Sequence, residues 1–289
     1  MHFDSHVHSA ASPDSELDPV RAILALKKKG LGIAFTEHVD FVAPENDCTI
    51  VRPLSQDPIL SMAGGRDITA TDAPRSHTGD FVCDFDIYPS QYKPIQHEYG
   101  RDNVLLGLEL GLSAAYYPIN KALAARDYDF ILGSIHYVDG CDIYYSGASM
   151  EPYEFCRQYL IYSKKMVEYC GFFDSFGHID YIMRYCEKAA RAFTYANFPQ
   201  TFDALFRALA EKDLAMEINT SRFGDNKLVG QLLPMYKRFR ELGGRYVTIG
   251  SDAHNKHGLG RFYEKGLGLA NMAGLVPVYF RERVRTICE

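Results

Sequence analysis

The chain has 289 residues, of which 47% are hydrophobic and 24% charged, and its formal net charge is −6. This composition is typical of a folded globular enzyme and excludes a disordered chain, and no stretch approaches the ~20 uncharged apolar residues of a membrane-spanning helix. The negative charge, with no basic run longer than Lys27-Lys28-Lys29, argues against nucleic acid as a partner. We therefore expect neither a membrane nor a nucleic-acid partner.

The first half of the chain alternates strand-like and helix-like segments. HFDSHVH at residues 2–8 predicts a strand, and residues 16–29 predict an amphipathic helix. A second strand, GIAFTEH at 32–38, precedes a long stretch, 39–100, for which the many Pro, Gly, Asp and Ser residues predict irregular structure. Within that stretch we expect residues 61–80 to form an exposed loop or lid.

The second half continues the alternation more regularly. The predicted strands are 103–111, 129–137, 173–180, 214–221 and 246–254, and the predicted helices are 115–126, 151–170, 198–212, 227–242 and 258–273. Apolar strands alternating with helices predict a parallel sheet covered by helices, in a single domain over residues 1–289. Because no G-x-G-x-x-G turn follows a strand, a closed or distorted barrel is favoured over an open doubly wound sheet.

Seven cysteines are scattered along the chain, and no two of them form a C-x-x-C pair. Their odd number and spacing fit reduced thiols better than a disulfide framework or a zinc ribbon. The opening residues, Met-His-Phe-Asp, contain neither the basic nor the apolar region of a secretory signal. We expect a cytoplasmic protein.

Histidines and acidic residues fall at the ends of six of the seven predicted strands. They are His6, His8, Glu37, His38, Glu109, His136, His178, Asp180, Asp252 and His254. In a parallel barrel the C-terminal ends of all strands open on one face, which carries the active site. For any one of these residues a hydrogen-bonded structural role is the simpler interpretation, but their recurrence predicts a shared site.

Individual positions support a metal site. His6 and His8 are two residues apart on a strand, so both imidazoles point to the same side and can reach one cation. Glu109 lies in the apolar strand VLLGLELG, where an unpaired carboxylate is costly, so we expect it to contact either metal ions or an arginine. Asp252 and His254 follow a strand beside small residues, which leaves access for a ligand.

These motifs, in this order, resemble the PHP (polymerase and histidinol phosphatase) superfamily: H-x-H, T-E-H, GLELG, GSIHY, GHID and GSDAH. Within it, SPDSELDPV, AFTEHVDF, GSIHYVDGCDIY, EINTS and GSDAH with GLGRFYE most closely resemble PHP-type histidinol-phosphate phosphatases. The resemblance spans residues 2–275. Residues 43–80 match nothing we can place and are interpreted as a family-variable insertion.

The resemblance implies a distorted (β/α)7, TIM-like barrel with three divalent metal ions at the C-terminal ends of the strands. Zinc, manganese and iron all suit such ligands. The first ion is expected on His6, His8, Glu109 and Asp252, the second on Glu109, His136 and His178, and the third on His38, His254 and Asp14. Glu37 and Asp180, beside ligands, are expected to orient imidazoles rather than to react.

The activity implied by the resemblance is hydrolysis of L-histidinol phosphate to L-histidinol and phosphate in histidine biosynthesis. A metal-bridging hydroxide is expected to attack the phosphorus in line. Asp252 would accept the water's proton, His254 would assist the leaving alkoxide, and Arg222, with Arg184 as second choice, would orient the phosphate. The alternatives are another phosphoesterase, acting on a different small monoester or on a phosphodiester, and a metal-binding module without catalysis. Oligomeric state stays open.

Overall fold

The computed structural model describes residues 1–41, 81–146 and 150–289. Its central feature is a sheet in which the strands from β1 to β11 pair in parallel, in the order β1-β2-β4-β5-β8-β9-β10-β11. Seven of these strands correspond to the predicted ones: β1 (His2–Val7), β2 (Leu31–Asp40), β4 (Val104–Gly111), β5 (Phe130–Ser134), β8 (Ser175–Phe176), β9 (Ala215–Asn219) and β10 (Tyr246–Gly250).

The sheet curves until its first strand lies beside the end of β10. The amide of Asp252 donates to the carbonyl of His6 at 2.8 Å, and the amide of His8 donates to the carbonyl of Ala253 at 3.0 Å. The buried Asp4 carboxylate also accepts bonds from Ser251, at 2.8 Å from its amide and 2.6 Å from its hydroxyl. The predicted α/β, barrel-like fold is confirmed.

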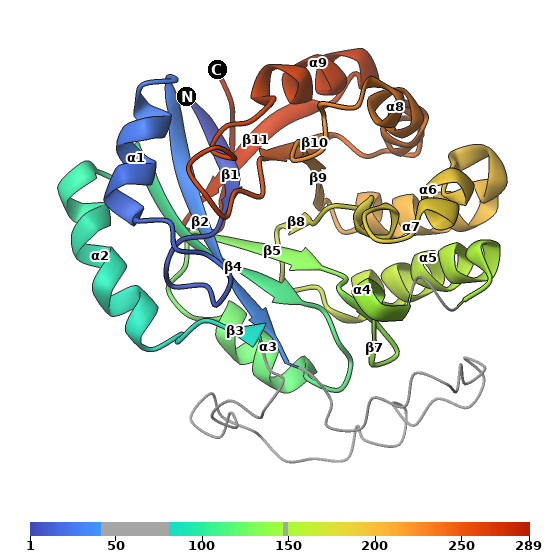
Figure 1. The fold of residues 1–289 in the computed structure, drawn as a ribbon, viewed down its shortest axis with the longest axis horizontal. Helices are drawn as coiled ribbons and strands as arrows, with labels where there is room; N and C mark the ends of the chain where they lie inside the picture. Colours follow the sequence, from blue (N-terminus) through green and yellow to red (C-terminus); the bar gives the residue numbers. More distant parts are fainter. Residues whose placement is uncertain (42–80, 147–149) are drawn as a thin grey trace.

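Helices cover the outside of this sheet (Figure 1). The six predicted helices are present as α1 (Pro19–Lys27), α3 (Tyr117–Ala124), α5 (Pro152–Tyr169), α7 (Pro199–Glu211), α8 (Asn226–Glu241) and α9 (Tyr263–Ala273). Proline at the first turn of α1, α5 and α7 is pre-organised for helix entry. The side chains of Asp18, Glu151 and Asp225 cap α1, α5 and α8 by accepting amide hydrogens. None of the helices in the described ranges is long and apolar enough to span a membrane.

Shorter elements connect the strand ends. They are the hairpin β6 (Tyr137–Val138) and β7 (Cys141–Asp142), the helices α4 (Ile143–Ser146) and α6 (Glu187–Ala192), and 3-10 turns at Tyr181–Met183 and Tyr195–Asn197. The β6–β7 hairpin turns through Asp139 and Gly140, both at positive φ, which is the two-residue turn that Asp-Gly favours. This hairpin follows directly after His136.

The prediction of irregular structure over 39–100 is wrong for its last part. β3 (Phe81–Val82) pairs antiparallel with the end of β2, and α2 (Ile87–Tyr99) is a helix of 13 residues. The helix was missed because it contains Pro94 and buries a stripe of hydrogen-bonding residues, Tyr88, Tyr92 and Gln96, rather than aliphatic ones. The predicted loop at 61–80 and the insertion at 43–80 lie outside the described residues.

A C-terminal hairpin was not predicted. β11 (Val276–Arg281) and β12 (Val284–Ile287) are antiparallel, joined by Glu282 and Arg283 at positive φ. Arg283 anchors the turn: its guanidinium donates to Asp174 Oδ2 at 2.5 Å and to the carbonyls of Ala124 and Phe172, each at 2.7 Å. Because β11 pairs with the first residues of β10, the hairpin lies at the end of the sheet away from the predicted site.

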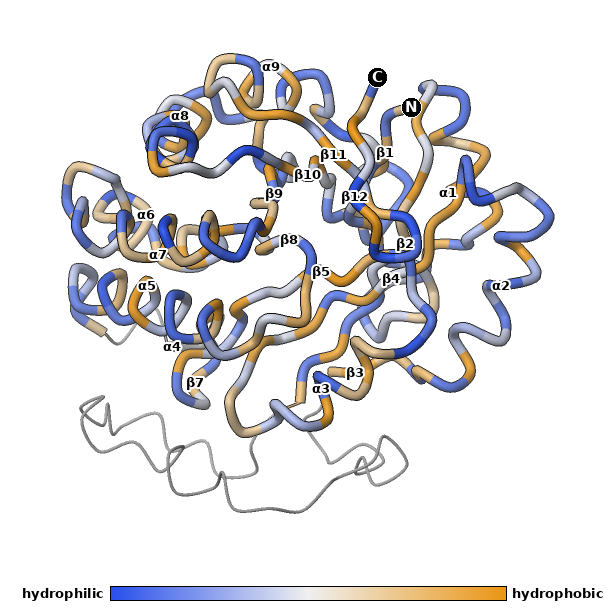
Figure 2. The backbone as a smooth tube through the Cα atoms, turned by 180° about the vertical axis from the view of Figure 1, so that it is seen from behind, coloured by the Kyte–Doolittle hydropathy of each residue, from blue (hydrophilic) through white to orange (hydrophobic). Residues whose placement is uncertain are grey.

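The apolar side chains of the strands pack into two buried clusters, and Figure 2 shows hydrophobic residues recurring along the strands and the helices around them. β2 is buried along its whole length, including polar residues such as Glu37, His38 and Asp40. Buried polar groups are costly unless they are paired or bind an ion. The buried polar side chains of β2 therefore indicate a polar centre inside the fold.

Candidate metal centre

A cavity of about 660 Å³, the central cavity, lies at the C-terminal ends of the strands. It is lined by Asp14, His38, Asp40, Phe81, Glu109, His136, Tyr137, Asp142, Tyr144, His178, Tyr181, Arg184, Tyr185, Asp252 and His254. His6 and His8 lie directly beneath this lining, fully buried against Glu109. The residues singled out in the sequence as metal ligands thus lie together.

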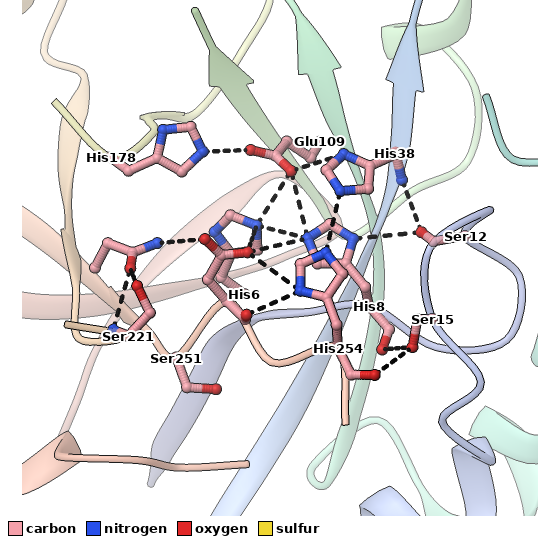
Figure 3. Close-up of polar contacts among 12 residues, drawn as sticks. His6, His8, Ser12, Ser15, His38, Glu109, His178, Ser221, Ser251 and His254 are labelled. Atoms are coloured by element: carbon pink, nitrogen blue, oxygen red, sulfur yellow. Dashed lines mark hydrogen bonds and ion pairs between the residues drawn. The ribbon is translucent and has the colours of Figure 1, made fainter. Parts of the chain in front are cut away.

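The six histidines of this group face one another in pairs through their Nε2 atoms. The Nε2–Nε2 distances are 2.9 Å in the first pair (His6–His8), 3.3 Å in the second (His136–His178) and 3.3 Å in the third (His38–His254). We call these the three imidazole pairs; Figure 3 shows the first and third converging with His178 and Glu109. Two nitrogens bound to one tetrahedral zinc at ~2.0–2.1 Å are about 3.4 Å apart. The second and third pairs have this spacing, and the first pair is shorter by about 0.5 Å.

Glu109 lies between the pairs. Its Oε2 is 3.2 Å from His6 Nε2 and 3.4 Å from His8 Nε2. Its Oε1 is 2.8 Å from His178 Nε2 and 3.3 Å from His136 Nε2. Oε2 is also 3.1 Å from Nδ1 of His38, in the third pair. The two oxygens thus face different imidazoles, which is the arrangement of a bridging carboxylate.

Two further carboxylates complete the groups. Asp252 Oδ1 is 3.5 Å from each Nε2 of the first pair. Asp14 Oδ2 is 2.7 Å from His254 Nε2 and 3.6 Å from His38 Nε2, in the third pair. The structure thus brings together the three ligand groups that the family resemblance implied.

The electrostatics of the centre suit cations. Burial would raise the pKa of Glu109, but the surrounding imidazoles hold it well below its ordinary range. Burial and the neighbouring His38 lower the pKa of His8 to about 4, so its ring is neutral and able to bind a metal. Burial lowers the pKa of His6 and His136, but adjacent carboxylates outweigh it and raise the pKa of both rings, to about 10 for His136. Carboxylates that favour a protonated imidazole would equally favour a divalent cation at its nitrogen, and the donor set fits zinc-like ions.

Two buried carboxylates that the sequence analysis missed hold the imidazoles from behind. Glu217 Oε1 is 2.6 Å from His6 Nδ1, and its Oε2 accepts from the amide of His178 at 2.6 Å. Asp40 Oδ1 is 2.8 Å from His136 Nδ1. A carboxylate on the far nitrogen fixes the ring orientation and leaves Nε2 for the metal. A signal existed: Glu217, like Glu109, interrupts an apolar strand, and Asp40 lies two residues from His38 on the same side.

The two residues expected to orient imidazoles lie in different surroundings. Glu37 accepts the Ser12 hydroxyl at 2.5 Å, and Ser12 Oγ is in turn 3.3 Å from His8 Nδ1 and accepts from the amide of His38 at 3.0 Å. Glu37 thus reaches the imidazoles through a serine. Asp180 Oδ2 is buried without a hydrogen-bond partner among the described residues, and its nearest ion-pair contact is Arg222 Nη1 at 4.0 Å. Arg184, His178 and Arg222 all lie close enough to act on the pKa of this carboxyl, which burial raises.

The two candidate arginines also differ. Arg184 lines the central cavity and donates from Nη1 to Asp252 Oδ2 at 2.7 Å, while its Nε and Nη2 are buried without a partner in the described ranges. The side chain of Arg222 is 35% exposed and is not among the cavity-lining residues. The geometry therefore favours Arg184, the second choice from sequence, as the group that meets an anion.

Comparisons with known proteins point in one direction. The PHP domain family model matches residues 4–221. A probable histidinol-phosphatase of Clostridium acetobutylicum is 32% identical, over 98% of each chain, and the histidinol-phosphatase of Lactococcus lactis is 27% identical, over 87% of this chain and 84% of its own. The crystal structure of histidinol phosphate phosphatase from Lactococcus lactis, complexed with zinc, L-histidinol and phosphate, superimposes with a TM-score of 0.79 at 26% identity, covering 99% of this chain and 98% of the other.

Proposed function

This chain belongs to the PHP domain family, and from that premise we propose that it is a metal-dependent phosphomonoesterase that hydrolyses L-histidinol phosphate to L-histidinol and phosphate. The resemblance read from the sequence motifs is thereby confirmed. This reaction is a step of histidine biosynthesis, and the similar proteins of Clostridium acetobutylicum and Lactococcus lactis are named for it. We further propose a cytoplasmic enzyme with one domain over residues 1–289.

The observation that carries the proposal is the set of three imidazole pairs with Glu109 between two of them. We propose that each imidazole pair would hold one divalent ion. Asp252 would also bind the ion at the first pair, Glu109 the ions at the first and second pairs, and Asp14 the ion at the third pair. Zinc is our first choice because the similar solved structure contains it, and manganese or iron would suit the same donors. When bound, such ions neutralise charge on phosphate oxygens and lower the pKa of water.

The chain's own residues handle protons and phosphate. Asp252 is ionised at neutral pH, because His6 and Arg184 outweigh burial and hold its pKa well below the ordinary range. Its Oδ1 faces the first pair, so we assign it the proton of the attacking water. Arg184 lines the cavity, and its buried Nε and Nη2 have no partner among the described residues. We therefore assign this guanidinium to the phosphate oxygens, where it would orient the ester and stabilise the charge of the transition state.

For His254 the geometry supports the ligand role over the proton-donor role. Its Nε2 faces Asp14 and His38, and its Nδ1 is 3.0 Å from the carbonyl oxygen of Asp252. Both nitrogens are therefore engaged, which leaves no nitrogen to protonate the leaving alkoxide. We do not assign Arg222 to the phosphate, because it lies beside Asp180 and is not among the residues that line the cavity.

The proposal is tested by counting metals in the purified protein and measuring phosphate release from L-histidinol phosphate, other monoesters and a diester. We expect the highest kcat/KM with L-histidinol phosphate. Comparable rates on every monoester would remove the histidine-pathway assignment. A preference for the diester would favour a phosphodiesterase, and metal binding without turnover would favour a non-catalytic module.

A further inference from the structure

One wall of the central cavity combines a carboxylate with aromatic rings. We propose that Asp142, on this wall, binds the ammonium group of the substrate and thereby selects phosphate monoesters of amino alcohols. The inference rests on the proposed phosphomonoesterase function and names the feature of the alcohol that the site recognises. We define the cation wall as Asp142 with Tyr137, Tyr144, Tyr181 and Tyr185, all of which line the cavity.

The β6–β7 hairpin fixes Asp142 next to the metal centre. Asp142 pairs across the hairpin with Tyr137, the residue after His136, and the amide of Ile143 donates to the carbonyl of His136 at 3.0 Å. Asp142 is therefore held beside the second imidazole pair by backbone bonds. In L-histidinol phosphate two carbons separate the ester oxygen from the nitrogen, so a group that binds the ammonium must lie close to the ions that hold the phosphate. The position of Asp142 meets this requirement.

Among the described residues, the imidazole of His136 is the cation that acts on Asp142, and Tyr137 forms a side-chain hydrogen bond with its carboxylate. Its Oδ1 accepts from the amide of Tyr144 at 2.7 Å. Within the part of the chain that the structure describes, no lysine or arginine forms an ion pair with it, and the guanidinium that lines the cavity, Arg184, is paired with Asp252. Burial raises the pKa of the Asp142 carboxyl, as is usual for an acid held partly out of water. An organic cation in the cavity would offset this cost.

The tyrosines extend the wall from the metal centre to the surface. The ring of Tyr181 lies 4.7 Å from that of His136, and the rings of Tyr181 and Tyr185 are 5.3 Å apart, edge to face. Tyr144 meets Tyr185 in a second edge-to-face contact at 4.8 Å, and the two are 54% and 40% exposed. Aromatic faces attract cations and pack against planar rings. A carboxylate beside such rings favours a cationic alcohol over a neutral or anionic one.

The test uses Asp142→Asn with two matched pairs of esters, each with and without the amine. The pairs are L-histidinol phosphate with 3-(imidazol-4-yl)propyl phosphate, and L-phenylalaninol phosphate with 3-phenylpropyl phosphate. We expect the substitution to raise KM for the amine-bearing esters about tenfold, the loss of one hydrogen bond to a charged group, with kcat little changed. KM for the two deamino esters should stay within about twofold, and their turnover also shows that the variant is folded.

Asp139→Asn is the matched control, because Asp139 lies in the same hairpin turn but is not among the cavity-lining residues. It should leave all four KM values unchanged. Equal changes for esters with and without the amine in Asp142→Asn would overturn the inference, as would a wild-type enzyme that does not distinguish them. A wild type that prefers L-phenylalaninol phosphate to L-histidinol phosphate would refute the proposed function. In that case the inference about Asp142 would still stand if the wild type preferred each amine-bearing ester to its deamino partner and Asp142→Asn removed this preference.

Discussion

Replacing Glu217 by glutamine should weaken metal binding at the first imidazole pair. The carboxylate accepts two short bonds, from His6 Nδ1 and from the amide of His178, both at 2.6 Å. Glutamine keeps one acceptor oxygen and places an NH2 group against the other donor. One charge-assisted bond, about 1.5–3 kcal/mol, is thus lost, and His6 loses the partner that fixes its ring.

The expected magnitude is a 10–100-fold loss of metal affinity, the range typical of residues that orient a ligand from behind. The assay is competition for the metal with a chromophoric chelator, followed by phosphate release at saturating metal. Glu211→Gln, an exposed glutamate at the end of α7, is the control and should match the wild type. Wild-type metal affinity in Glu217→Gln would refute the reasoning. A lower unfolding temperature of the metal-free protein with unchanged affinity would show that Glu217 only supports the fold.

Three more predictions follow from the same geometry. His8→Ala and Asp252→Ala should each abolish phosphate release, and near-normal turnover of either would contradict the metal model. Metal binding should release protons, and the metal affinity should fall as the pH is lowered, because carboxylates raise the pKa of imidazoles such as His136 and the protons on these rings compete with the cation. Calorimetry in buffers of different ionisation enthalpy measures the number of protons released. Zero proton release would refute the prediction. Arg283→Ala should lower the free energy of unfolding in urea by about 1–3 kcal/mol, since it removes the cation that pairs with the buried Asp174 and leaves only the amide of Ile131 as a donor to this carboxylate. We expect kcat at saturating metal to stay unchanged, and a lost kcat would show that the hairpin also shapes the site.

Much of the fold follows from local pattern. Apolar strands alternating with amphipathic helices placed the seven strands and six helices because burial imposes periodicity on both. The pattern failed where burial uses other side chains. In α2 the buried stripe consists of tyrosines and a glutamine whose polar atoms are satisfied inside: Gln96 donates to Asp129 at 2.6 Å and Tyr88 to the carbonyl of Gly107 at 3.2 Å.

The candidate site was predictable to the extent that strand topology decides it. Residues at the ends of parallel strands must meet on one face, so eight of the nine proposed ligands could be named from strand positions alone. The ninth, Asp14, and the grouping around three ions came from the family resemblance. Glu217 and Asp40 carry a similar signal, but which imidazole each one contacts could not be predicted, because the contact of Glu217 with His6 joins residues 211 positions apart. Asp142 was also missed: its place depends on a two-residue turn that folds it back beside His136.

The central claim is that each imidazole pair holds one divalent ion. Crystals of the zinc-loaded protein, measured at the zinc absorption edge, test it most directly through an anomalous difference map. We predict three peaks, one between the Nε2 atoms of each pair, with Glu109 in contact with two of them. A map that lacks a peak at one or more of the three pairs, or that shows zinc bound only elsewhere, would contradict the account.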